Sequence, residues 1–380
     1  MALERFKFEQ GPIRPPSEAG SLLIRLTRNC PWNRCLFCPV YKKEKFSRRS
    51  LDEIKADISV MAEAAARIRS ISGSDSSPDV ISRQAVATIQ AEHPEMLQIA
   101  YWLYGGGKNV FLQDGDSLLM PLNDLLDILS FLKEKFPSID RITTYARSKT
   151  LLRFSQPEMK LLRDQGLSRI HVGLESGSDK VLDFMKKGVT GEQHVQAGLL
   201  VKAAELSLSF YVILGLGGQS LWREHALDSA KVINRVNPDF IRMRTLAIHP
   251  ASPLYQSFLD GSFTPLTDDQ VIREELLFVE NLEGIDSYFV SDHILNLLEE
   301  VEGQLPADKE QMLGIMKRYL NWPEEKRDIF RLGRRTGNFR QLDDLDHQAF
   351  LQPVEEYYRQ LQSQNITVDE QVRQLMLRFI

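Results

Sequence analysis

The feature that most constrains this chain is a group of three cysteines, Cys30, Cys35 and Cys38, the only ones among its 380 residues. They lie within nine positions, directly after an apolar segment, residues 22–26, that is typical of a β-strand. Closed structural zinc sites and closed ferredoxin-type clusters take four protein ligands, so three cysteines complete neither. A cubane cluster held by three thiolates would leave one iron open to a small molecule. The alternatives are a disulfide with a spare thiol, and a zinc site completed by a histidine.

The composition is that of a globular protein, with 43% hydrophobic and 26% charged residues and a net charge of −5. This balance gives no global attraction to nucleic acid or to an anionic membrane. The length allows one large domain with an appendage, or two domains. No apolar run approaches the roughly 20 residues that cross a bilayer, and the N-terminus has no signal-peptide core. We therefore expect a cytoplasmic protein, where thiols stay reduced and can hold iron.

Strand and helix patterns alternate along the first two thirds of the chain. The strands are expected at residues 22–26, 110–112, 141–145, 169–174, 209–214 and 240–248. The helices are expected at residues 51–66, 122–136, 157–165, 179–185, 190–206 and 221–236, with a loop over residues 70–78. This alternation predicts an α/β fold with a parallel sheet, either open or curled into an incomplete barrel.

The last third changes character, since apolar periodicity there favours helices over residues 268–280, 292–302, 309–320 and 354–361. We expect a mostly helical C-terminal region. One stretch in it, residues 326–340, is rich in arginine and lysine, with Phe330 and Phe339 between them. Such a stretch suits RNA or an anionic substrate, and it is also typical of a solvated helix face.

The first strand, the three-cysteine loop and Phe37 together resemble the signature of radical S-adenosylmethionine (SAM) enzymes. The resemblance is to the branch that includes methylthiotransferases and oxygen-independent coproporphyrinogen oxidase. It implies a partial (β/α)6 barrel over residues 21–258, preceded by a lead-in at 1–20 and followed by the helical region 259–380. It also implies a [4Fe–4S] cluster on the three cysteines and SAM as cofactors, with Phe37 beside the adenine. The first cysteine gap is four residues, one longer than the commonest spacing in that family.

The resemblance assigns further residues that follow the expected strands. Gly115 and Asp116 would bind the ammonium group of SAM, with Asp114 beside them, although this segment is also a common turn sequence. Arg147 would pair with the SAM carboxylate or lie in solvent. Glu175 and Ser176 would face the cofactor, although residues of this kind also start helices, as Ser178 could.

The last two strands carry weaker assignments. Ile213 and Gly215 match part of the segment that contacts adenine, but a glycine and a glutamate expected around them are absent. Arg244 would face cofactor or substrate. His249 and His293 could act as acids or ligands, but a lone histidine is more often structural.

These features predict a single-cluster enzyme that cleaves SAM to a 5′-deoxyadenosyl radical, which takes a hydrogen atom from an organic substrate. Because about 20 residues precede the first strand, we expect neither the second cluster of methylthiotransferases nor the binding domain of cobalamin-dependent methylases. The expected partners are a small-molecule substrate and an electron donor such as flavodoxin or ferredoxin. The alternatives are a carrier of haem, porphyrin or an iron–sulfur cluster without turnover, and an enzyme that modifies RNA.

Overall fold

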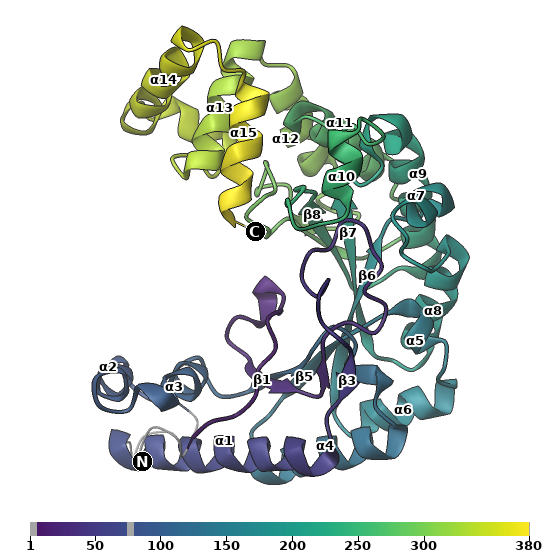
Figure 1. Ribbon diagram of the computed structural model, residues 1–380, viewed down its shortest axis with the longest axis vertical. Helices are drawn as coiled ribbons and strands as arrows, with labels where there is room; N and C mark the ends of the chain where they lie inside the picture. The colour runs from purple at the N-terminus through teal and green to yellow at the C-terminus, as the bar shows by residue number, and fades with distance from the viewer. Residues whose placement is uncertain (1–5, 74–79, 380) are drawn as a thin grey trace. The chain divides into compact units, whose positions relative to one another are not determined.

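The computed structural model describes residues 6–73 and 80–379 (Figure 1). The chain divides into two compact units. The first takes its described residues from 1–32, 43–172 and 200–208, and the second consists of residues 33–42, 173–199 and the described part of 209–380. The eight-stranded sheet has the order β1-β4-β5-β6-β7-β8-β9-β10, and strands β6 and β7 contribute residues to both units. The α/β fold class with a largely parallel sheet is confirmed.

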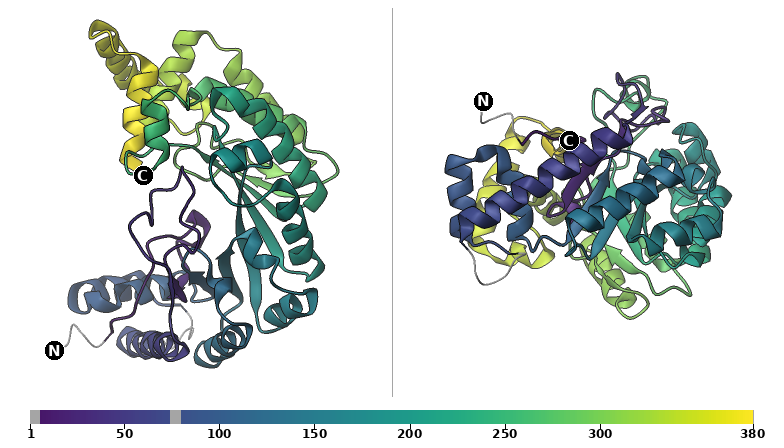
Figure 2. Two further views of the ribbon diagram at one scale, coloured as in Figure 1. Left: turned by 45° about the vertical axis from the view of Figure 1, so that its right-hand side comes forward. Right: turned by 90° about the horizontal axis from the view of Figure 1, so that it is seen from below.

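Parallel strands build the first unit, in which β1 pairs with β4, β4 with β5, and β5 with β6. These strands are β1 (Leu22–Arg25), β4 (Asn109–Gln113), β5 (Arg141–Ala146) and β6 (Leu167–Glu175), with a small ribbon of β2 (Thr27–Arg28) and β3 (Ser47–Arg48). The helices are α1 (Leu51–Ser72), α2 (Arg83–Glu92), α3 (Leu97–Tyr104), α4 (Leu122–Lys135), α5 (Ser148–Leu151) and α6 (Gln156–Asp164). Helices α1, α4 and α6 lie side by side (Figure 2).

Strands β7 (Ser207–Leu214), β8 (Phe240–Thr245) and β9 (Tyr288–Val290) pair in parallel in the second unit, and β10 (Gly303–Gln304) pairs antiparallel to β9. Its helices up to the last strand are α7 (Asp179–Phe184), α8 (Gly191–Ala203), α9 (Gly218–Val236), α10 (Leu254–Leu259) and α11 (Asp268–Glu280). After β10 come α12 (Lys309–Leu320), α13 (Glu324–Thr336), α14 (Gln348–Ser363) and α15 (Val368–Met376). Helix α11 packs against both α9 and α12.

Local sequence explains where several helices begin. The Ser50 hydroxyl accepts from the Glu53 amide while the Glu53 carboxylate accepts from the Ser50 amide, which is the capping box that starts α1. The same reciprocal pair starts α6 at Ser155 and α11 at Thr267. Helix α1 ends at Gly73, which has φ +58, a conformation that glycine adopts without strain.

One expectation for the C-terminal third is wrong, although the region is mostly helical as predicted. The predicted helix at 292–302 is absent, because Leu295, Leu297 and Leu298 are buried in an irregular segment and Asn296 bonds to β8 instead. The Asn296 side chain donates to the Met243 carbonyl at 3.1 Å and accepts from the Thr245 hydroxyl at 3.0 Å. The region also adds β9 and β10 to the sheet.

The loop predicted at residues 70–78 begins later than expected, because α1 continues to Ser72. Residues 74–78 lie outside the described part of the chain.

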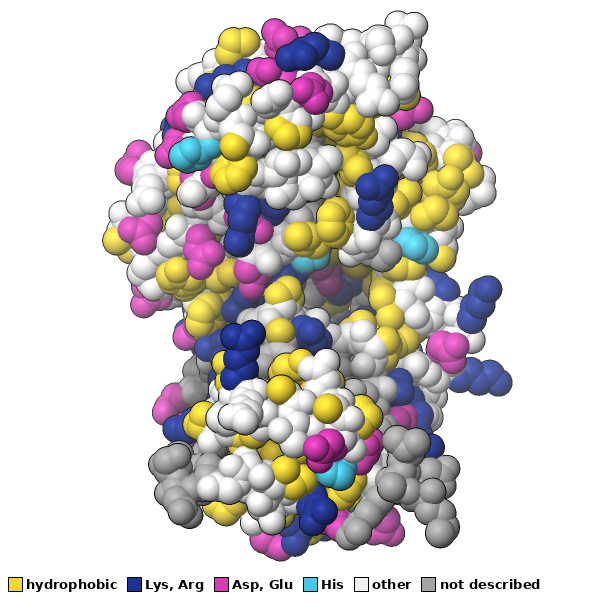
Figure 3. Space-filling model, turned by 90° about the vertical axis from the view of Figure 1, so that its left-hand side faces the viewer, with side chains coloured by type: hydrophobic (Ala, Val, Ile, Leu, Met, Phe, Trp, Pro, Cys, Tyr) yellow, Lys and Arg dark blue, Asp and Glu magenta, His cyan; other side chains and the backbone are white. Residues whose placement is uncertain are grey.

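The described residues contain no helix long and apolar enough to cross a membrane. On the face drawn in Figure 3, acidic and basic side chains are interspersed, as the net charge of −5 leads one to expect.

Candidate functional site

The segment that leads into the cysteines is fixed in the first unit by Asp114, which is fully buried. Its Oδ2 accepts from the Arg25 guanidinium at 2.7 Å and from the Asn29 amide at 3.2 Å. Asn29 has φ +70, so the backbone turns directly before Cys30. A Cβ on Gly115 would lie 3.6 Å from the Cβ of Cys30, so the β4 end and Cys30 are in close approach. Asp114 thus holds the start of the cysteine loop.

The other two cysteines lie in the second unit on residues 33–42. The Lys42 ammonium donates to the Cys35 carbonyl at 2.7 Å. The Leu36 amide donates to the Met185 carbonyl at 3.0 Å, and the Leu36 carbonyl accepts from the Leu254 amide at 2.9 Å. These bonds tie the segment between Cys35 and Cys38 to the end of α7 and the start of α10.

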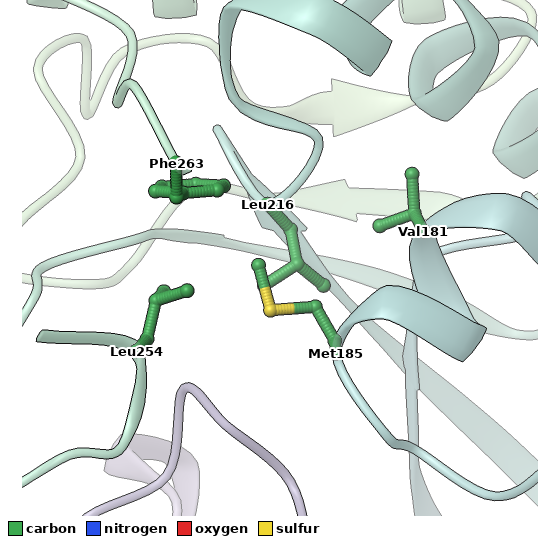
Figure 4. Packing of buried hydrophobic residues seen from close by; sticks show 5 residues of the cluster. All are labelled: Val181, Met185, Leu216, Leu254 and Phe263. Atoms are coloured by element: carbon green, nitrogen blue, oxygen red, sulfur yellow. The ribbon is translucent and has the colours of Figure 1, made fainter. Parts of the chain in front are cut away.

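An apolar cluster supports this segment, formed by Val181, Met185, Leu216, Leu254 and Phe263 (Figure 4). Leu36, Phe37 and Ile213 are partly buried and pack against the same cluster. Phe37 and Ile213, both expected near the adenine, therefore share one apolar support.

The chemistry of the cysteines fits an iron–sulfur cluster, because thiolates are the usual ligands of such clusters and all three side chains are only partly buried. Within residues 6–73 and 80–379, no three side chains of His, Cys, Asp or Glu are gathered as a metal site. The fit therefore rests on the donor set and on its short loop.

Asp116 is fully buried in the first unit. Its Oδ2 accepts from the Thr150 hydroxyl at 2.5 Å, while its Oδ1 has no hydrogen-bond partner among the described residues. Burial raises the pKa of Asp116 to about 7, against the opposing effects of the Thr150 hydrogen bond and the Arg147 charge. Arg147 stacks its guanidinium on the Trp32 ring at 4.9 Å. A buried carboxyl oxygen without a donor suits an ammonium group.

Glu175 is the last residue of β6 and has φ +63, an uncommon conformation for a residue with a side chain. The buried ammonium of Lys187 donates to its Oε1 at 2.9 Å and lies 5.9 Å from the centroid of the Phe37 ring. A Cβ on Gly173 would stand 2.1 Å from Oε1 of Glu175, so a side chain at this position would displace the carboxylate from its observed place. The structure thus brings Phe37 and Glu175 together through Lys187, which sequence analysis missed.

Ser176 is fully buried, and its Oγ lies 2.8 Å from Nδ1 of His225. Nε2 of His225 lies 2.9 Å from the Ile213 carbonyl, which can only accept, so Nε2 carries the proton. Burial lowers the pKa of His225 to about 4, so the ring is neutral and its Nδ1 accepts from the Ser176 hydroxyl. His225 thus links Ser176 with Ile213. A lone histidine in a helix gives no sequence signal for this role.

Arg244 is opposite Ile213 in the pairing of β7 with β8. Its guanidinium donates to Oδ1 of Asp292 at 2.9 Å and lies 4.7 Å from the centroid of the Tyr211 ring. Arg242 donates to Oδ2 of the same carboxylate at 2.8 Å. The Asp292 carboxylate therefore accepts from two guanidinium groups, one of which is opposite Ile213 of the expected cofactor segment.

The two histidines named from sequence have local contacts. His249 accepts from the Ala251 amide at 2.9 Å, and His293 accepts from the Leu295 amide at 3.4 Å. Burial, and to a smaller extent the Arg244 charge, lower the pKa of His293 to about 4. Both contacts are with an amide two residues along the chain, as in a turn.

The basic stretch at 326–340 is largely interior, unlike either expectation. Arg331, Arg334 and Arg335 are 5%, 6% and 3% exposed. Arg335 pairs with Asp268 at 2.6 Å, Arg334 pairs with Glu299 at 2.8 Å, and Arg331 pairs with Asp328 and Asp369. These three arginines are paired with carboxylates, of which Asp268 is buried and Asp328, Glu299 and Asp369 are partly exposed, and they do not form a surface for RNA.

Comparison with known proteins gives a family match over residues 24–230, more than half of the chain, to the model described as the Radical SAM superfamily. Among curated proteins, a tRNA uridine(34) acetyltransferase from Methanocaldococcus infernus is 23% identical over 120 residues, covering 31% of this chain and 22% of that protein. An uncharacterized methyltransferase from Pyrococcus horikoshii is 23% identical over 162 residues, covering 43% of this chain and 34% of that protein.

Among solved structures, coproporphyrinogen III oxidase from Escherichia coli, a radical SAM enzyme, is similar with a TM-score of 0.43 and 16% identity. That match covers 74% of this chain and 55% of the other. The matched part of the present chain thus spans 22% and 34% of the two curated relatives and 55% of this enzyme.

Proposed function

This chain belongs to the radical SAM superfamily, and we propose that it cleaves SAM reductively to methionine and a 5′-deoxyadenosyl radical that abstracts hydrogen from an organic substrate. The observation that carries the proposal is the family match over residues 24–230, because that range includes the three cysteines, Asp116, Glu175 and Ile213. As a radical SAM enzyme, the protein uses a [4Fe–4S] cluster and SAM as its cofactors.

In this proposal Cys30, Cys35 and Cys38 would hold the cluster, and the chemistry supplied by the bound cluster would be the one-electron reduction that breaks a carbon–sulfur bond of SAM. The electron comes to the cluster from a donor such as flavodoxin or ferredoxin. The close approach of Gly115 to Cys30 supports a site in which the β4 end borders the cluster loop.

The remaining residues would hold SAM in place. We assign its ammonium group to the unpartnered Oδ1 of Asp116 and to the Gly115 segment. Arg147 would pair with its carboxylate. Phe37, Glu175, Ser176, Ile213 and Arg244 would border the adenosine part. Fixed contacts of this kind keep the reactive carbon near its target and away from water.

The test is the fate of SAM in anaerobic protein supplied with a strong reductant. We expect 5′-deoxyadenosine to exceed S-adenosylhomocysteine, and deuterium to pass into it from a labelled substrate. If S-adenosylhomocysteine dominates, the hydrogen-abstraction assignment is wrong. If neither product forms and SAM still binds, a carrier without turnover is favoured.

A second candidate is an RNA-modifying reaction, which is supported by the similarity to the Methanocaldococcus infernus tRNA uridine(34) acetyltransferase. It would need a binding surface other than Arg331, Arg334 and Arg335, since these are buried and paired. Transfer of deuterium from labelled RNA into 5′-deoxyadenosine would favour it over a small-molecule substrate.

A further inference from the structure

Helix α11 places two adjacent carboxyl groups in the interior of the second unit. Glu274 is fully buried and Glu275 is 2% exposed. Burial raises the pKa of both to about 8, so both are mostly neutral at pH 7. Glutamates are almost never fully buried unless they have a partner, so the contacts of each need an explanation.

Glu274 is hydrogen-bonded to the turn after β7. Its Oε2 accepts from the Gly215 amide at 2.5 Å. Gly215 has φ +82, which turns the chain out of the strand, and its carbonyl accepts from the Gly218 amide at 3.0 Å. Glu274, some 60 positions further along the chain, therefore fixes the first amide of this turn.

His225 holds the same turn from α9. Its Nε2 donates to the Ile213 carbonyl at 2.9 Å and lies 4.0 Å from Oε2 of Glu274. Its Nδ1 accepts from the Ser176 hydroxyl. The end of β6 and the turn after β7 are thus joined through two buried side chains that the cofactor assignments do not use.

We propose that Glu274 and His225 are positioning residues that fix residues 213–218 and Ser176 in the conformation that receives the adenosine part of SAM. This inference rests on the proposed function, because it takes the β7 turn as part of the SAM site. Because the Gly215 amide is already held in place, SAM binding does not have to order a loose turn, which would cost binding free energy. The carboxyl must also reach Gly215, so side-chain length matters more than charge.

Two substitutions at Glu274 separate length from charge. Glu274→Gln keeps an oxygen acceptor at the same reach and is neutral, as the native group mostly is. Glu274→Asp keeps the acid but shortens the side chain by one carbon, so the bond to Gly215 is lost. The matched controls are Glu275→Gln and Glu275→Asp, which alter an equally buried carboxyl on the same helix.

The measurements are SAM affinity by equilibrium dialysis and amide hydrogen exchange of residues 213–218, both in anaerobic protein with its full iron content. We expect Glu274→Asp to weaken SAM binding about tenfold, the scale of one hydrogen bond, and to speed exchange in the turn. The SAM affinities of Glu274→Gln and of both Glu275 variants should stay within about threefold of the parent value. A threefold change is near the lower end of what a single hydrogen bond contributes.

The inference is overturned if Glu274→Asp binds SAM as the parent does, or if Glu275→Asp weakens binding equally, which would indicate a general loss of packing. Weak binding by Glu274→Gln with normal binding by Glu274→Asp would also overturn it, because charge would then matter and reach would not. Failure of the parent protein to bind SAM would instead refute the proposed function, and with it the cofactor role of this turn.

Discussion

The Lys187 ammonium donates to Oε1 of Glu175 at 2.9 Å while lying 5.9 Å from the centroid of the Phe37 ring. One buried cation therefore orients a carboxylate at the end of β6 and contacts the aromatic ring that precedes Cys38. Lys187 thus contacts both Phe37 and Glu175, the two positions here that the resemblance to radical SAM enzymes assigns to the cofactor.

Removing either partner should weaken SAM binding. We expect Glu175→Ala to lose about 1.5–3 kcal/mol of SAM binding free energy, the scale of a hydrogen bond to a charged group. Lys187→Met should lose a similar amount, because Glu175 would no longer be held. The exposed neighbour Lys186 offers the control Lys186→Met. Calorimetric titration of reconstituted protein would decide, and equal affinities in all three variants would contradict the assignment.

The Asp116 carboxyl should contribute directly to SAM affinity. Asp116→Ala removes the unpartnered oxygen, and we expect a loss of about 1.5–3 kcal/mol with unchanged iron content. Asp140→Asn changes an exposed carboxylate in the same unit and should bind normally. Normal binding by Asp116→Ala would place the ammonium of SAM elsewhere.

The three cysteines should be jointly required for the cluster. Anaerobically reconstituted protein should hold about four irons per chain, as a [4Fe–4S] cluster requires. Replacement of Cys30, Cys35 and Cys38 by alanine should abolish iron binding and the visible absorption of the cluster. Zinc in place of iron, or a cluster that survives the triple change, would contradict the ligand assignment.

The buried arginines of α13 should act on stability. Arg335→Ala leaves Asp268 without its closest cation, and we expect a cost of about 3–5 kcal/mol, as for other broken buried pairs. Arg340→Ala, at an 81% exposed side chain, should cost less than about 1 kcal/mol. Thermal unfolding of both variants would check this. A stable Arg335→Ala protein that loses substrate binding would restore a ligand role for this stretch.

Burial of Glu275 should make stability fall as pH rises. Its pKa is raised from 4.5 to about 8 in the folded protein, so between these values the folded state holds a proton that the unfolded state has lost. The stability conferred by the neutral group is present at low pH and disappears as pH rises toward 8. The full shift corresponds to an upper limit of about 5 kcal/mol. The Tm of Glu275→Gln minus the Tm of the parent should therefore be larger at pH 8 than at pH 5.5. An equal difference at both pH values would contradict the raised pKa of Glu275.

Much of the fold could be predicted from the sequence because its signals are local. Alternating apolar runs placed β1, β4, β5, β6, β7 and β8, and the capping sequence at Ser50 marks the start of α1. The three cysteines within nine residues, the strand before them and Phe37 carry the resemblance to the family, and such a donor set suits an open iron–sulfur cluster. These features depend on residues close together in the chain.

Tertiary structure alone decided the partners of the side chains. Asn296 bonds to β8 and prevents a helix at 292–302, and Arg335 meets Asp268 from 67 positions away. Lys187, His225 and Glu274 carry no motif, yet they hold Glu175, Ile213 and Gly215 through contacts that exist only once helices pack on the sheet. Local pattern sets which elements form because backbone hydrogen bonds and apolar periodicity are short-range. Buried polar groups pair with whatever donor or acceptor the packed fold brings to them, because leaving them unpaired in the interior costs more than any local preference provides.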